Sequence, residues 1–353
     1  MFDVLIKNES PNRDVFLEDI DISPSSYRRS KNDGNKIGEV ILPKLATYFN
    51  YNLCDKDTID QIESKINEIY FAIYYKNYEN YDEHVCWLEN MLSKRYLLFP
   101  IFLLFKILMK LNSQNNPRTI INELYESYYE IKSYESFFEN ELLEIIEILD
   151  VTFKKDIDNY FISKTYVNEL TYHTLATRCN LLGRYIESIY FCKILKEKLI
   201  ADENYKRVYY INLTLISNYN YLLMFREADV LVQKQLLNLK ALNNTDDEYN
   251  FTNLLYTITC LGLKKYNKVI ELLDEKKGTT LTETVCLLTS HYFTNKNKYL
   301  ENYNQFISNV NNENTLICLK TLNVILKSNN KKKVLELEQY DINKSVLEIL
   351  KKM

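Results

Sequence analysis

The stretch DISPSSYRRSKNDGNK, residues 21–36, places basic side chains directly behind a serine-rich helix start. Ser23 followed by Pro24 is typical of a helix N-cap and its first helical position. Guanidinium, ammonium and hydroxyl groups on such a helix suit contacts to DNA phosphates and base edges. The candidate DNA-binding residues are Arg13, Ser23, Ser25, Ser26, Arg28, Arg29 and Lys31. A solvated helix face without a DNA partner is the alternative interpretation of the same residues.

The other residues whose side chains could act in catalysis or bind a metal form no catalytic or metal-binding pattern. The chain has no GxxxxGK phosphate loop, and its three histidines lie far apart with no HExxH. Acidic pairs such as Glu144 and Glu147 stand at helical spacing on an expected solvated face. The seven cysteines are dispersed without a CxxC pair, which is typical of reduced, buried thiols. We therefore expect a protein that is not an enzyme and uses no cofactor or metal.

Composition favours a helical protein. Among 353 residues, 5 Gly and 5 Pro are too few for the turns of a β-sandwich or a doubly wound sheet. The 30 Tyr and 16 Phe provide large side chains for packing between helices. The net charge of −4 gives no general attraction to nucleic acid, so any DNA contact must be local. The longest apolar run, YLLFPIFLLF, is interrupted by Pro100 and is too short to span a membrane. The N-terminal residues MFDVLIKNES do not resemble a signal peptide, so we expect a cytoplasmic protein without a membrane partner.

From about residue 60 onward, apolar residues recur at three- and four-residue spacing between short polar connectors, as in successive helices. The segment Thr171 to Leu199 reads as two helices joined by a Leu-Leu-Gly-Arg-Tyr turn, with small residues where the helices must approach closely. Its marker positions are Leu175, Ala176, Gly183, Tyr185 and Ser188. Related positions in later copies are Phe225 with Ala228 and Tyr266 with Val269, and those in an earlier copy are Phe71, Ala72, Tyr81 and His84.

These copies resemble tetratricopeptide repeats, although they are spaced more widely than the usual repeat of about 34 residues. Because such repeats cannot bury their faces alone, the resemblance implies a stacked α-solenoid over residues 60–353. The last helices read as terminal caps or as a dimerisation element.

Residues 1–52 resemble the lambda-repressor-like, or XRE, helix-turn-helix family. Ile22 stands at the turn before the recognition helix, and the pair Leu45-Ala46 follows it at the interval of that family. Phe16, Ile20 and Tyr27 match further core positions. The sequence departs from the family at Asn12-Arg13, where a Gln is usual, and at Pro43, which we expect to kink the last helix. The expected fold class is all-α, with a short helix-turn-helix module followed by a tetratricopeptide-like α-solenoid.

This combination resembles the RRNPP group of quorum-sensing transcriptional regulators. The resemblance implies a homodimer that binds double-stranded DNA and whose repeat domain binds a short signalling peptide. Asn side chains can hold an extended peptide because each offers a donor and an acceptor. The candidate peptide-binding residues are His173, Thr177, Asn180, Ser217, Asn220 and Tyr221. Two alternatives remain open: a protein-interaction adaptor whose N-terminal module no longer reads DNA, and a phage or plasmid regulator without a peptide ligand.

Overall fold

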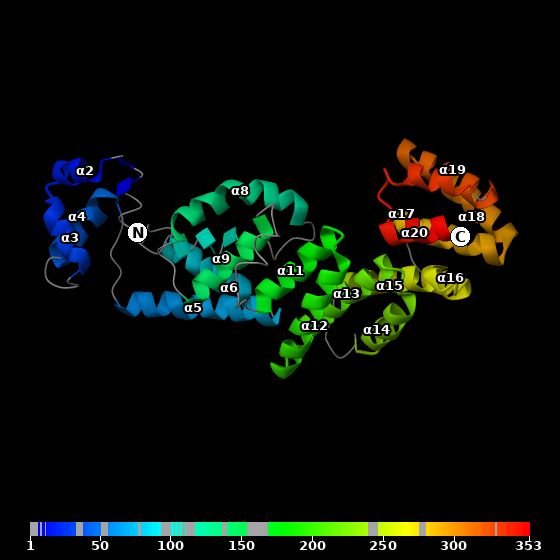
Figure 1. The fold of residues 1–353 in the computed structure, drawn as a ribbon, viewed down its shortest axis with the longest axis horizontal. Coiled ribbons are helices and arrows are strands. Elements are labelled where there is room, and N and C mark those ends of the chain that lie inside the picture. Colours follow the sequence, from blue (N-terminus) through cyan, green and yellow to red (C-terminus); the bar gives the residue numbers. More distant parts are fainter. Residues whose placement is uncertain are drawn as a thin grey trace. The chain divides into compact units, whose positions relative to one another are not determined.

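The computed structural model describes most of the chain. The described residues are 6–7, 9–10, 12–32, 38–50, 56–76, 79–92, 100–101, 103–104, 106–107, 110, 117–135, 140–153, 169–238, 246–274, 280–328 and 330–353. They form helices and turns without a strand, which confirms the all-helical fold class. The contacts divide the chain into two compact units, Met1–Thr174 and Leu175–Met353, which are described separately below. Figure 1 labels the helices of both units. This division falls later in the chain than the predicted boundary near residues 52–60.

The first unit begins with three short helices around a small core of their own. They are α2 (Arg13–Asp19), α3 (Pro24–Asn32) and α4 (Gly38–Tyr48), with α2 packed on α3 and α3 packed on α4. The buried core side chains are those of Ile6, Phe16, Leu17, Ile22, Tyr27, Ile41, Leu45 and Ala46. The core therefore contains the turn isoleucine, the tyrosine of α3 and the Leu-Ala pair that the sequence assigns to it.

The turn between α2 and α3 reverses the chain within a few residues. Asp21 adopts a left-handed φ of 58°, and the backbone N–H of Ile22 donates to the carbonyl of Leu17 at 2.8 Å. This bond satisfies a carbonyl that the end of α2 leaves without a helical partner. Pro43 lies inside α4, which continues through it as one helix from Gly38 to Tyr48.

The structure describes four longer helices in the rest of the first unit before α11 (Glu169–Leu181). They are α5 (Lys56–Tyr75), α6 (Tyr81–Leu92), α8 (Pro117–Ser133) and α9 (Asn140–Phe153), and they pack as the consecutive pairs α5 with α6 and α8 with α9. The predicted register of α5 is wrong, because Phe71 is 55% exposed whereas Ile69 and Ile73 are buried. Nδ1 of His84 lies 3.0 Å from Lys65 Nζ and 3.0 Å from Glu68 Oε2. His84 therefore does not serve as the small residue of a close helix crossing.

The second unit is a succession of helices in which each packs on its neighbours. After α11 (Glu169–Leu181), which spans the boundary between the units, it contains α12 (Tyr185–Ala201), α13 (Tyr205–Tyr221), α14 (Phe225–Asn238), α15 (Asp246–Gly262), α16 (Tyr266–Asp274), α17 (Leu281–Thr294), α18 (Lys296–Asn309), α19 (Glu313–Ser328), the 3₁₀ helix η3 (Lys331–Leu337) and α20 (Lys344–Lys352). Packed consecutive pairs of this kind are consistent with an α-solenoid.

Equivalent turns recur between consecutive helices of the second unit. Gly183, Leu223 and Lys264 all have left-handed φ values, of 79°, 60° and 59°. In each turn the next residue donates its backbone N–H to the carbonyl five residues earlier, at 2.8 Å, as between Arg184 and Cys179. Glu203, between α12 and α13, has the same geometry, with a φ of 55° and an N–H of Asn204 that donates to the carbonyl of Leu199 at 2.8 Å. In the described part of the second unit this helix-ending motif is therefore used four times, once with glycine and three times without it.

Small side chains allow the predicted close crossings. Ser188 is fully buried, and its Oγ donates to the carbonyl oxygen of Ala176 at 2.6 Å, which joins α12 to α11. Ala228 and Val269 occupy the corresponding positions of the next two hairpins and are also fully buried. The positions Ser188, Ala228 and Val269 that the sequence marks in the second unit are therefore real packing positions, unlike Phe71 in the first unit.

Aromatic residues at the start of the second helix of each hairpin contact the end of a later helix. Tyr185 stacks on Tyr221 with ring centroids 4.7 Å apart, and Tyr266 stacks on Phe293 at 5.1 Å. Between them, the ring of Phe225 lies directly over Gly262. These contacts join one hairpin to the next, as the stacking of a repeat array requires. Of the helices that the structure describes, none is both long and apolar enough to cross a membrane.

Candidate functional site

The N-terminus of α3 is held by a cluster of three serine hydroxyls. The backbone N–H of Ser26 donates to Ser23 Oγ at 3.1 Å, which confirms Ser23 as the N-cap. Ser23 Oγ also donates to Ser26 Oγ at 2.8 Å and lies 3.1 Å from Ser25 Oγ. Ser23 and Ser25 are exposed, so the start of the helix presents hydroxyl groups to solvent. An anion approaching this end would meet these groups and the positive end of the helix dipole.

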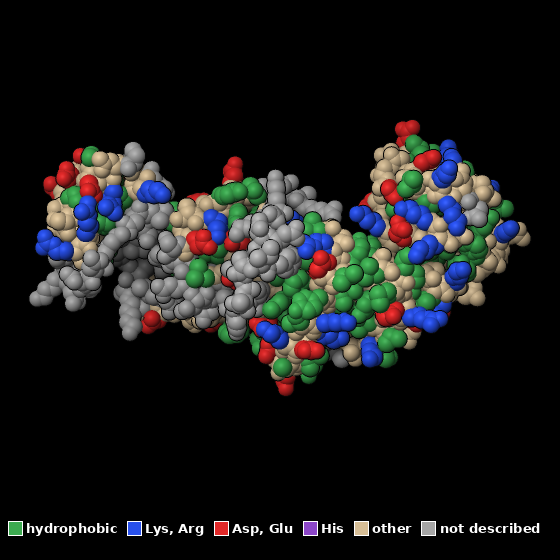
Figure 2. All heavy atoms as spheres, in the orientation of Figure 1, with side chains coloured by type: hydrophobic (Ala, Val, Ile, Leu, Met, Phe, Trp, Pro, Cys, Tyr) green, Lys and Arg blue, Asp and Glu red, His purple; other side chains and the backbone are tan. Residues whose placement is uncertain are grey.

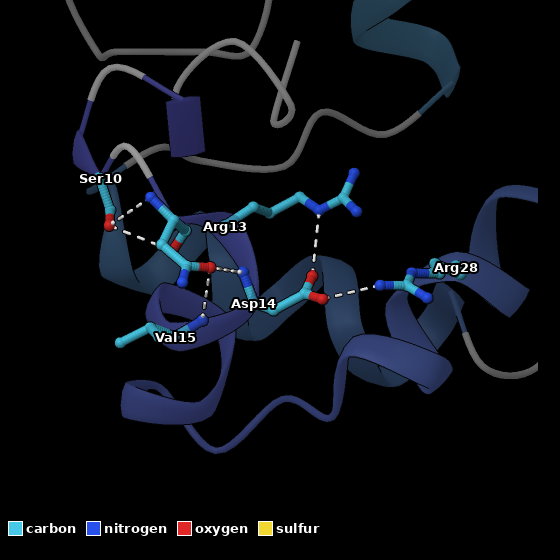
Figure 3. Close-up of polar contacts among 6 residues, drawn as sticks. Ser10, Arg13, Asp14, Val15 and Arg28 are labelled. Atoms are coloured by element: carbon cyan, nitrogen blue, oxygen red, sulfur yellow. Dashed lines mark hydrogen bonds and ion pairs between the residues drawn. The ribbon is translucent and has the colours of Figure 1, made fainter.

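Two of the predicted arginines converge on one carboxylate (Figure 3). Arg28 Nη2 of α3 lies 2.7 Å from Asp14 Oδ2, and Arg13 Nε lies 3.4 Å from Asp14 Oδ1. Asp14 is in the first turn of α2. Its backbone N–H donates to Oδ1 of Asn12, the N-cap of this helix, at 3.2 Å. The three side chains carry a net charge of about +1 because two guanidiniums share a single carboxylate.

This ion pair is exposed to water. The side chains of Arg28 and Asp14 are 59% and 44% exposed, so the pair contributes no more than about 1 kcal/mol. A phosphate could therefore displace Asp14 at little cost. Asp14 follows Arg13 directly in the sequence, but its contact with Arg28 depends on how α2 packs on α3.

The remaining candidates on α3 are less constrained. Arg29 is exposed, and the side chain of Lys31 lies outside the part of the chain that the structure describes. Lys44 of α4, which is not among the residues predicted from the sequence, donates from Nζ to the carbonyl oxygen of Asp21 at 3.2 Å. Its ammonium group therefore lies at the turn that precedes α3.

On the second unit, the predicted peptide-binding wall contains a chain of hydrogen bonds. Asn180 of α11 donates from Nδ2 to Asn218 Oδ1 at 2.8 Å and to Ser217 Oγ at 3.5 Å. Asn218, which is fully buried, donates in turn to Ser188 Oγ at 2.8 Å. Asn218 is not among the residues predicted from the sequence, although it is two residues from Asn220. The half-buried Asn180 and Ser217 form the outer end of this chain.

Asn220 lies in a different environment from Asn180. Its side chain is 1% exposed, its Nδ2 donates to the carbonyl of Leu255 at 3.2 Å, and its Oδ1 accepts from Thr259 Oγ1 at 3.0 Å. These bonds join α13 to α15 and use both ends of the amide. The structure therefore does not bring Asn180 and Asn220 together on one exposed surface.

The other three candidates lie at different depths. Thr177 is exposed on α11, whereas His173, on the part of α11 that belongs to the first unit, is half-buried. Tyr221 is half-buried and stacks on Tyr185. Burial raises the pKa of the Tyr185 hydroxyl, and the neighbouring Tyr221 raises it further.

Buried thiols are shielded from ionisation. Burial raises the pKa of Cys192 to about 12 and that of Cys260 to about 11. Cys86 is the exposed exception among the described cysteines. Within the described ranges, no group of three or more His, Cys, Asp or Glu side chains is placed to hold a metal ion.

The chain matches no protein-family model, and no curated protein or solved structure is similar enough to indicate a relationship. The described residues define its class as an all-helical protein built from packed consecutive helix pairs. They do not identify a particular family.

Proposed function

We propose that this protein is a DNA-binding transcriptional regulator in which α3 enters the major groove. The observation that carries this proposal is the surface of α3. Ile22 and Tyr27 anchor one side of the helix in the core formed by α2, α3 and α4, whereas Arg28 and Arg29 are exposed to solvent. A rigid helix with exposed arginines is what groove recognition requires.

Binding would use the capped end of α3 and the arginines at Asp14. Ser23 and Ser25 would donate to phosphate oxygens, and Arg28 would exchange the carboxylate of Asp14 for a phosphate. Arg13, held beside Arg28, would contact the same strand. Asp14 then acts as a placeholder that keeps both guanidiniums oriented in the absence of DNA.

The repeat-like second unit would carry the effector site, as the resemblance to the RRNPP group implies. We place a short, extended peptide against Thr177, Asn180 and Ser217, because these polar side chains are accessible at the outer end of the Asn180–Asn218 chain. Asn220 is omitted because it is buried and both ends of its amide are occupied. Peptide binding would alter the geometry of a homodimer and thereby its affinity for DNA.

Salt-dependent binding to genomic DNA fragments tests the DNA-binding part. Replacing both Arg28 and Arg29 with Ala should abolish specific binding and reduce the slope of log affinity against log salt by about 2, because each phosphate contact contributes about 0.9. Lys320→Ala is the control, since Lys320 is an exposed cation on α19. Unchanged affinity and slope in the double variant would exclude α3 as the recognition helix.

A second candidate function is a protein-interaction adaptor with no DNA partner. The ion pair between Arg28 and Asp14 favours it, because it gives Arg28 a role within the folded protein. Failure of the correctly folded wild-type protein to retain any fragment at low salt would support the adaptor instead.

A further inference from the structure

The second unit contains an open pocket of about 480 Å³ between α12 and α14. Leu215 and Tyr219 of α13 form its floor, and Val230 and Leu231 of α14 add apolar side chains. Its lining cations are Lys193, Lys196 and Arg226, and its lining carboxylate is Glu227. The pocket therefore combines an apolar floor with a mainly positive rim in a chain whose net charge is −4.

The rim cations have no carboxylate within ion-pair distance among the described residues. Other basic residues of the unit do have partners, as in the pairs of Lys206 with Glu248 at 3.0 Å and Lys265 with Asp229 at 2.8 Å. Burial lowers the pKa of Lys196, and the nearby Lys234 lowers it further. The repulsion between Lys196 and Lys234 raises the free energy of the unoccupied surface, and an anionic ligand would relieve it.

Apolar side chains extend the pocket into a larger surface. Ile186 and Tyr190 of α12 are 72% and 61% exposed, and Val230 and Leu237 of α14 are 60% and 82% exposed. Figure 2 shows hydrophobic side chains gathered in the region of α12 to α14, with Lys and Arg side chains among them. Exposed apolar residues of this size, rimmed by charge, are typical of protein-binding surfaces.

We propose that the α12–α14 surface binds an acidic, amphipathic helix of a partner protein. The apolar residues of the partner would cover the pocket floor and Val230, while Asp or Glu side chains beside them would pair with Lys193, Lys196 and Arg226. A helix fits because apolar anchors at i, i+3, i+4 and i+7 lie on one side with charges on their flanks. The inference is independent of α3 and of the Asn180–Asn218 chain.

A designed peptide serves as the probe. It has about 18 residues, roughly five helical turns, with Leu on one face and Glu on the flanks, and it carries a fluorescent label. A matched peptide with Lys in place of every Glu tests the charge requirement. Fluorescence anisotropy with the full-length protein, at low and at physiological salt, measures both affinities.

Three protein variants locate the site. Lys193→Glu combined with Arg226→Glu reverses two exposed rim charges, and Val230→Asp places a charge on the apolar part. Lys320→Glu is the control, because it reverses an exposed charge on α19. We expect the acidic peptide to bind the wild type at least tenfold more tightly than it binds either surface variant, with Lys320→Glu unchanged. Circular dichroism verifies that the variants are folded.

Three results would overturn the proposal. Equal affinity for the acidic and the Lys-containing peptides would remove the charge argument, and equal affinity for the wild type and both surface variants would place binding elsewhere. Self-association of the wild type in sedimentation, abolished in the rim double variant, would show that a second copy of this chain covers the surface instead.

Discussion

Gly262 in the second unit is packed so closely that the effect of an alanine substitution on stability can be predicted there. A Cβ at Gly262 would lie 2.5 Å from three ring carbons of Phe225, far closer than van der Waals contact allows. Gly262 does not occupy the left-handed region, so its backbone would accept alanine without strain. Any cost of Gly262→Ala therefore arises from the ring of Phe225.

Two opposing effects set the magnitude for Gly262→Ala. Forcing an extra methyl group into a packed contact costs about 1–3 kcal/mol. Replacing glycine by alanine in a helix returns up to about 1 kcal/mol, and less at the last residue of α15. We expect a net loss of about 1–2 kcal/mol in the free energy of unfolding.

Urea denaturation followed by circular dichroism measures this loss as a lower midpoint at unchanged slope. In a Phe225→Ala background the clash is absent, so Gly262→Ala should be neutral or stabilising there. Gly183→Ala is the matched control: its Cβ would meet only Tyr185 Oη at 3.9 Å, but its φ of 79° strains alanine. Phe225→Ala should therefore not rescue Gly183→Ala. If Gly262→Ala is as stable as the wild type, or loses the same stability with and without Phe225, the reasoning is refuted.

Three further predictions follow from single positions. Lys264→Gly should stabilise the protein by about 1 kcal/mol, because the exposed Lys264 holds a left-handed φ of 59° that glycine adopts without strain; the urea midpoint measures it. Asn220→Ala should cost about 1–3 kcal/mol in the same assay, because it removes the bonds to Leu255 and Thr259 from a buried site. Burial raises the pKa of Cys192 to about 12, so at pH 8 its thiolate is scarce and a thiol reagent should modify it only after unfolding.

Each of these expectations has a clear contrary result. A lower midpoint for Lys264→Gly would mean that the lost side chain matters more than the turn strain. Unchanged stability of Asn220→Ala would return that residue to the candidate peptide site. Modification of Cys192 in the native protein, detected by mass spectrometry at the rate of the exposed Cys86, would contradict its burial.

Local sequence patterns were sufficient to predict much of this molecule. Ser23 before Pro24 predicted a helix start because an N-cap depends on only a few consecutive residues. The small residues Ser188 and Ala228 predicted close helix crossings, because two backbones approach only where side chains are small. The scarcity of Gly and Pro favoured helices throughout, and the described residues agree.

The contacts between helices could not be predicted from the sequence and were determined only by the tertiary structure. Asn180 and Asn220 look equivalent in the sequence, yet one lies at the surface end of a hydrogen-bond chain and the other is buried between α13 and α15. Phe71 looked like a core residue but is 55% exposed, because each position along a helix turns the side-chain direction by about 100°, enough to move a residue off the buried stripe. Periodicity locates a helix and its apolar stripe, whereas the rotation of that helix depends on side chains distant in the chain.

The environment of the basic helix shows the same division. Its cap and its charges can be read from residues 21–36 alone. The bridge from Arg28 through Asp14 to Arg13 exists only because α2 packs on α3, which brings residues fourteen positions apart within 2.7 Å. An ion pair between separate helices leaves no periodic trace in the sequence, so only the packed structure could show it.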